Sequence, residues 1–69
     1  MSVYKIIEIV GTSAESWEKA AQAAMEAASK SIRDLRIAEV DKLDVQIEDG
    51  KIKFYRAKLK VSFKYQTGD

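Results

Sequence analysis

Acidic side chains in the strand-like parts of the sequence have the most versatile chemistry, because two brought together could transfer protons or hold a hard cation. They are Glu8, Glu39, Asp41, Asp44, Glu48 and Asp49. The sequence has no histidine and no cysteine, which excludes imidazole and thiolate metal ligands, disulfides and the commonest proton shuttle. Each acid has a plainer role as the partner of a base between Lys51 and Lys64. We therefore expect no enzyme, while calcium stays open on composition alone.

The basic segment from Lys51 to Lys64 carries its basic side chains among aromatic residues and so superficially resembles a platform for single-stranded nucleic acid. The facing acidic segment neutralises it, and the chain carries twelve basic and eleven acidic side chains, a net charge of +1. A charge so close to zero creates no field that attracts nucleic acid or anionic lipid. The three glycines are far apart, so no phosphate-binding loop is present. We expect neither a nucleic-acid nor a membrane partner.

A chain of 69 residues is long enough for one domain, which we assign to residues 1–69. A domain of this size buries only about 60% of its unfolded surface, so oligomerisation or a bound cation usually supplements its core. No apolar run reaches the ~20 residues that a membrane span needs, and the first residues do not resemble a signal peptide. We expect a cytoplasmic protein that associates with itself.

The first half of the sequence predicts one strand and one helix. Residues 3–10 are rich in β-branched and aromatic side chains and are followed by Gly11, which predicts a strand that ends there. Thr12 and Glu15 match a helix capping box, so the predicted helix covers residues 14–34. Its apolar stripe recurs every three or four positions and consists of Trp17, Ala20, Ala21, Ala24, Ala28 and Ile32.

The second half predicts a β-hairpin, residues 35–48 and 51–65, joined by a two-residue Asp-Gly turn. A right-handed crossover then predicts an α+β fold, β-α-β-β, with a three-stranded antiparallel sheet of order 1-3-2 wrapped around one helix. In this register paired residue numbers sum to ninety-nine. The opposite charges that meet are Glu48 with Lys51, Asp41 with Lys58, and Glu39 with Lys60.

In the same register the apolar residues change face along the hairpin, because side chains alternate strictly between the two faces of a sheet. We expect a bulge or bend near residues 41–44 and 55–57. Beyond it, four apolar side chains at the hairpin tip would face away from the helix and form an oligomer interface: Val45, Ile47, Ile52 and Phe54. The alternative is a twisted sheet whose tip curls over the helix.

Several segments, in order along nearly the whole chain, resemble the dodecin family. They are Tyr4-Lys5, Glu8 to Ser13, Trp17 to Ala21, Ala38 to Val40, and Tyr55 through Val61-Ser62-Phe63. The resemblance implies a β-α-β-β subunit and a hollow homododecameric shell with cubic 23 symmetry. It also implies a storage function without catalysis. Family members hold flavin (riboflavin, FMN or FAD) in pairs at subunit interfaces, and some carry coenzyme A near the three-fold axes.

Two positions depart from the flavin-binding pattern of that family. Ile37 stands where a tryptophan stacks on the flavin ring, and Arg56 stands where a glutamine holds the ring edge. Isoleucine has no π face, and arginine cannot accept a hydrogen bond. One interpretation is a shell that sequesters flavin or a related cofactor at Ile37 and Arg56, weakly and in a different pose. The other is a flavin-free structural dodecamer with calcium as a candidate stabilising ion, whose ligands the sequence does not identify. In this respect the chain resembles a branch of the family that lacks both residues.

Overall fold

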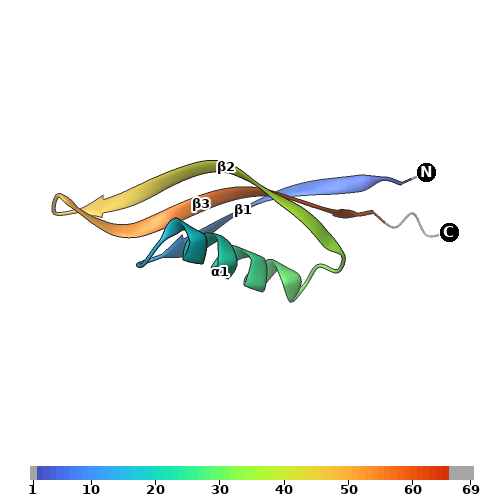
Figure 1. Cartoon of the computed structure of the whole chain (residues 1–69), viewed down its shortest axis with the longest axis horizontal. Coiled ribbons are helices and arrows are strands. Elements are labelled where there is room, and N and C mark those ends of the chain that lie inside the picture. Colours follow the sequence, from blue (N-terminus) through green and yellow to red (C-terminus); the bar gives the residue numbers. More distant parts are fainter. Residues whose placement is uncertain (1, 66–69) are drawn as a thin grey trace.

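The computed structural model describes residues 2–65, which form four elements in the order β1 (Tyr4–Ser13), α1 (Trp17–Ser29), β2 (Leu35–Glu48) and β3 (Lys51–Lys64). Strand β3 lies between the other two and is antiparallel to both, so the sheet order is β1-β3-β2 (Figure 1). The predicted β-α-β-β topology and the 1-3-2 order are confirmed. No helix within the described part of the chain is long and apolar enough to cross a membrane.

At Gly11, β1 and α1 approach each other too closely for a side chain. A Cβ atom at this position would overlap the carbonyl oxygen of Ala20 and lie 2.9 Å from the Cβ of Ala24. Glycine therefore lets the helix backbone reach the strand, which is a recognised use of glycine inside a strand. The prediction that the strand ends at Gly11 is wrong, because β1 continues to Ser13 and uses Gly11 as a contact point.

The helix is shorter than predicted at both ends. Its N-cap is Ser16 rather than Thr12, and the Ser16 hydroxyl accepts a hydrogen bond from the backbone N–H of Lys19 at 3.0 Å. Ser13 belongs to the turn that precedes the helix, where its hydroxyl accepts a hydrogen bond from the backbone N–H of Glu15. After Ser29 the chain leaves the helix, and Asp34 takes a φ of 59°, which is incompatible with a right-handed helix.

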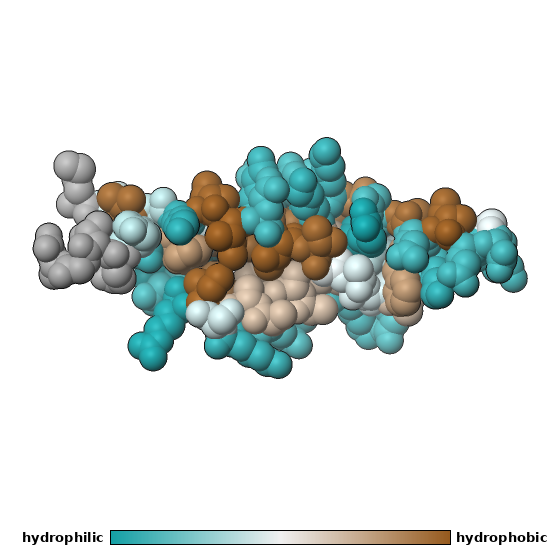
Figure 2. All heavy atoms as spheres, turned by 180° about the vertical axis from the view of Figure 1, so that it is seen from behind, coloured by the Kyte–Doolittle hydropathy of each residue, from teal (hydrophilic) through white to brown (hydrophobic). Residues whose placement is uncertain are grey.

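The buried core is small, and only two of its members are larger than alanine. They come from α1 and β3 and are Ala20, Ala24, Ala28, Ala57, Leu59 and Val61. The helix packs on β1 and β3, so β2 extends beyond its cover (Figure 1). All of β2 except Leu35 and Val45 is exposed. Apolar side chains therefore reach solvent on a molecule that measures 54 × 20 × 14 Å (Figure 2).

The hairpin register is interrupted by three extra residues, which are Arg36 and Asp41 on β2 and Lys53 on β3. The predicted pairing holds for Glu48 with Lys51 at the turn, and again from Val40 inward to Ile37. Between these stretches the pairing shifts by one residue, with Lys53 as the extra residue on β3 and Asp41 on β2. The shift at Asp41 lies within the predicted window of residues 41–44, whereas the shift at Lys53 lies before the predicted 55–57 and the shift at Arg36 lies outside both windows.

These bulges remove the predicted change of face. Because directly paired residues share a face, Val45, Ile47 and Ile52 lie on the same face of the sheet as α1. The prediction that these three face away from the helix is therefore wrong, since the extra residue at Asp41 restores the alternation. Phe54 pairs with a polar residue of β2 and lies on the outer face, the face opposite α1.

The contact at Gly11 makes a first prediction. Gly11→Ala is expected to lower the free energy of unfolding by at least about 2 kcal/mol, because the new methyl group overpacks the helix contact. Urea unfolding at a fixed chain concentration measures this loss. Gly50→Ala is the matched control: its φ of +74° costs about 1 kcal/mol, but the new Cβ meets nothing within 4 Å. An equal or smaller loss at Gly11 would contradict the close packing.

Candidate functional site

Ile37 and Arg56 both lie on the outer face of the sheet but are not brought together within one chain. Ile37 is 67% exposed on β2, and its backbone oxygen accepts a hydrogen bond from the Ser62 hydroxyl at 3.5 Å. Its pairing partner, Ser62, is six residues from Arg56 along β3, about 20 Å at 3.3 Å per residue. A flavin-sized ligand that contacts both positions would therefore need residues from two copies of the chain.

Arg56 is held by a carboxylate from the neighbouring strand. Its Nε donates to Oδ1 of Asp44 at 2.7 Å and its Nη2 donates to Oδ2 at 2.9 Å, a bidentate geometry. These hydrogen bonds are the main reason that the pKa of Asp44 lies below its ordinary value. Desolvation raises the pKa and so opposes this shift, and the positive charge of Arg56 lowers it further. The same pair raises the pKa of Arg56. One edge of the guanidinium is thus already committed to Asp44.

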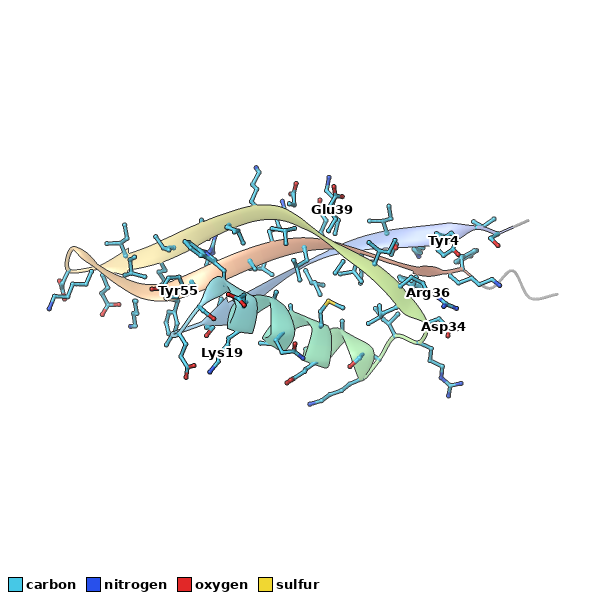
Figure 3. The ribbon with its side chains drawn as sticks, viewed as in Figure 1. Tyr4, Lys19, Asp34, Arg36, Glu39 and Tyr55 are labelled. Atoms are coloured by element: carbon cyan, nitrogen blue, oxygen red, sulfur yellow. The ribbon has the colours of Figure 1, made fainter. Side chains whose placement is uncertain are left out.

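Asp44 also connects the hairpin to the helix. Its backbone oxygen accepts a hydrogen bond from the indole Nε1 of Trp17 at 3.0 Å. The Trp17 ring meets the Tyr55 ring edge-on, with centroids 5.2 Å apart and an interplanar angle of 78°. Figure 3 shows Tyr55 beside the N-terminal end of α1, with Glu39 on the opposite side of the sheet. Trp17, Asp44, Tyr55 and Arg56 therefore form one junction between three elements.

Sequence reasoning named Asp44 as an acid with a basic partner, but it missed the pairing with Arg56 because of the bulge at Lys53. An uninterrupted register sets Asp44 opposite Tyr55, whereas the extra residue sets it opposite Arg56. The sequence did contain one signal: Asp44 and Arg56 have opposite charges, and the uninterrupted register sets Asp44 only one residue away from Arg56. The bulge also changes the partner of Glu48, which forms its ion pair with Lys53 at 2.8 Å.

A second group of charges crosses all three strands on the outer face. Lys58 Nζ lies 3.6 Å from Glu8 and 3.8 Å from Asp41, and Lys60 Nζ lies 4.0 Å from Asp41. Asp41 thus meets Lys58 as predicted, although Lys42 is the ladder partner of Lys58. Within residues 2–65 no three acidic side chains come together as a metal site would require. A calcium ion would therefore need oxygen ligands from more than one copy.

The predicted interface residues lie at the hairpin end of the molecule. Ile47 and Ile52 are 63% and 51% exposed, while Val45 and Phe54 are half-buried. The face of this hairpin on the α1 side carries two further exposed apolar residues. Because of the bulges, they lie on the same face as Val45, Ile47 and Ile52. We call this surface the arm face: Val40, Leu43, Val45, Ile47 and Ile52.

A second apolar surface lies on the other flank of the helix, where α1 meets the outer edge of β1. It is a groove of about 490 Å³, and we call it the β1–α1 groove. Small alanine side chains of α1 line it together with larger aliphatic residues. Its lining includes Ile7, Ile9, Ala24, Ala27, Ala28 and Ile32.

The Asp44–Arg56 pair makes a pH-dependent prediction. The pKa of Asp44 is lowered in the folded state. The ionised Asp44 carboxylate therefore stabilises the folded state in full at any pH above the ordinary aspartate pKa. That contribution is lost as the pH falls through the lowered folded-state value. Asp44→Asn is therefore expected to destabilise the protein at neutral pH and to flatten the acid limb of its melting temperature. Asp49→Asn, in the turn, is the control, and an unchanged acid limb in Asp44→Asn would exclude the pair as its cause.

Comparison with known proteins agrees with this geometry. The family model "Dodecin" matches residues 3–66. The chain is 52% identical over 65 residues to the protein named Calcium dodecin of Mycobacterium tuberculosis, covering 93% of this chain and 90% of that protein. It is 41% identical over 64 residues to the Dodecin of Thermus thermophilus, covering 93% of each. The crystal structure of the M. tuberculosis calcium dodecin, described as having a novel calcium-binding site, superposes with a TM-score of 0.85 at 44% identity, covering 99% of this chain and 97% of that one. The chain belongs to the dodecin family.

Proposed function

We propose that this chain assembles into a homododecameric shell that does not stack flavin. The observation that carries the assembly is the uncovered arm face of β2 and β3. The accessible surface of the chain is 5435 Å². A compact protein of 7.8 kDa exposes only about 4,400 Å². The excess, on the order of 1,000 Å², is comparable to the ~800 Å² that one partner contributes to a standard interface.

The shape of the chain supports the same proposal. Its radius of gyration is 14.3 Å, whereas a compact domain of 69 residues has about 11 Å. The chain has no cysteine that could supply a disulfide. Burial against further copies would complete so small a core. We take the number of copies, twelve, from membership of the dodecin family.

The ligand positions support a shell without stacked flavin. Ile37 cannot stack on an isoalloxazine ring, which forfeits about 1–3 kcal/mol per ring by analogy with the stacking of bases. Arg56 has already given two donors to Asp44 and has no acceptor for the ring edge. Storage of riboflavin, FMN or FAD at these positions is the competing function, and the experiment below distinguishes the two.

A bound calcium ion is a second candidate property of the shell, favoured by the 52% identity to the protein named Calcium dodecin. Calcium takes six to eight oxygen ligands. Acidic residues of the outer face, gathered from several copies, could supply them, because one chain brings too few together in its described part. We assign the shell a storage or structural role in the cytoplasm, without a catalytic step.

The ligand class is tested by titrating the purified protein in parallel with FMN and with calcium. We expect FMN fluorescence to stay unquenched at micromolar protein, because no ring is stacked. We expect EDTA to lower the melting temperature and added calcium to restore it. Quenching of FMN fluorescence would contradict the flavin-free shell, and a melting temperature insensitive to EDTA and calcium would remove the calcium role.

The double variant Ile37→Trp/Arg56→Gln is the control for this titration. It restores the stacking ring and the amide, so it should quench FMN fluorescence while keeping the size of the assembly. Each single variant should quench less than the double variant. A double variant of unchanged size that leaves FMN fluorescence unaltered would show that these are not the ligand positions.

A further inference from the structure

We infer that Asp44 determines the specificity of the candidate ligand site, because it keeps oxyanion groups such as phosphate away from Arg56. This role rests on the proposed flavin-free shell and names the chemical group that the site rejects. Asp44 acts through Arg56, so it is a positioning residue. Ile37 decides whether a ring can stack, whereas Asp44 decides which charge a ligand can carry.

The guanidinium of Arg56 has the geometry that recognises phosphate, but Asp44 already occupies it. Arginine has five donors in a planar fork, and it binds phosphate or carboxylate through two parallel hydrogen bonds. Nε and Nη2 of Arg56 donate such bonds to the two carboxylate oxygens of Asp44, at 2.7 and 2.9 Å. A phosphate group would have to displace this carboxylate or lie beside it, and two anions at one guanidinium repel each other.

The Asp44 carboxylate is held in place from the helix as well as from β3. The indole Nε1 of Trp17 donates a hydrogen bond to the Asp44 backbone oxygen at 3.0 Å. The bulge at Lys53 sets Asp44 directly opposite Arg56 on the outer face of the sheet. The Asp44 and Arg56 side chains are 52% and 46% exposed, so a ligand can reach both. Such a ligand meets an ion pair that is already formed.

The charges around Arg56 make the carboxylate of Asp44 decisive for an anion. The row across the sheet that contains Arg56 consists of Thr12, Arg56 and Asp44. In the neighbouring row on the same face, Lys58 pairs with Lys42. Lys58 has two acidic neighbours outside these rows, so the positive charge that Asp44 balances is centred on Arg56. Loss of the Asp44 charge would leave three basic side chains in the two rows, surroundings that attract phosphate.

FMN and riboflavin are the probes for this role, because they share a ring and differ by one phosphate group. Ile37→Trp is the background, since the added ring makes binding measurable by quenching of flavin fluorescence. In this background Asp44→Asn is expected to tighten the binding of FMN by at least about tenfold, and that of uncharged riboflavin by less than about twofold. The ratio of the two dissociation constants, at fixed ionic strength, is the readout.

Three control variants in the same background separate this role from a purely structural one. Asp49→Asn removes an equal charge from the hairpin turn and should leave the ratio unchanged. Asp44→Glu keeps the charge and should keep phosphate excluded. Addition of Arg56→Gln to Asp44→Asn should abolish the gain for FMN, because the guanidinium that would bind the phosphate is then absent.

Several results would overturn the role of Asp44. They are an unchanged ratio in Asp44→Asn, equal tightening of both ligands, a gain that survives Arg56→Gln, and no FMN quenching by the Ile37→Trp/Asp44→Asn variant. Light scattering checks that each variant keeps the mass of the unaltered protein, and Asp44→Ser replaces Asp44→Asn if it does not. FMN quenching by the unaltered protein would instead contradict the flavin-free shell, and the ratio would still test Asp44.

Discussion

The close approach of α1 to β1 at Gly11 is the constraint on which the rest of the structure depends. Only a residue without Cβ leaves room for the carbonyl of Ala20 and the methyl group of Ala24. This contact fixes the helix over β1 and β3, and a single helix of 13 residues cannot then also cover β2. The small alanine core, the exposed arm face and the open groove all follow from that position. The subunit therefore leaves apolar surfaces exposed, and we propose that other copies cover them.

The second organising feature is the junction at Asp44. The bulge at Lys53 brings Asp44 opposite Arg56, and the Trp17 indole donates to the Asp44 backbone oxygen. Helix and hairpin are thereby tied together at the place where the hairpin begins to extend past the helix. The same junction removes part of the hydrogen-bonding capacity of Arg56. One pair of residues thus stabilises the arm and lessens the suitability of Arg56 for a flavin ring edge.

Much of the fold could be predicted from the sequence, and what could not has local causes. The order of elements and the 1-3-2 sheet follow from hydrophobic periodicity, the Asp49-Gly50 turn and crossover handedness. The helix start was misplaced because Thr12 and Glu15 match a capping box, whereas Thr12 lies within β1 and Ser16 is the N-cap. Irregularities at Arg36 and Asp41 add two residues to β2, and one at Lys53 adds a residue to β3. No pattern of residue types in the sequence reveals these positions. The Asp44–Arg56 pair and the true face of Ile47 depend on those additions. Ile37 and Arg56 were identified through family resemblance, and their roles remain predictions.

The mass of the unaltered protein in solution tests the central claim most directly, namely that the subunit is completed by copies of itself. Light scattering coupled to size-exclusion chromatography, at micromolar concentration and physiological salt, measures it without a label or a ligand. The incomplete core and the exposed arm face predict association, and membership of the dodecin family predicts twelve copies, so we expect a single species near twelve times the chain mass of 7.8 kDa. A stable, folded monomer of 7.8 kDa would contradict it, because the uncovered face of β2 would then have no partner.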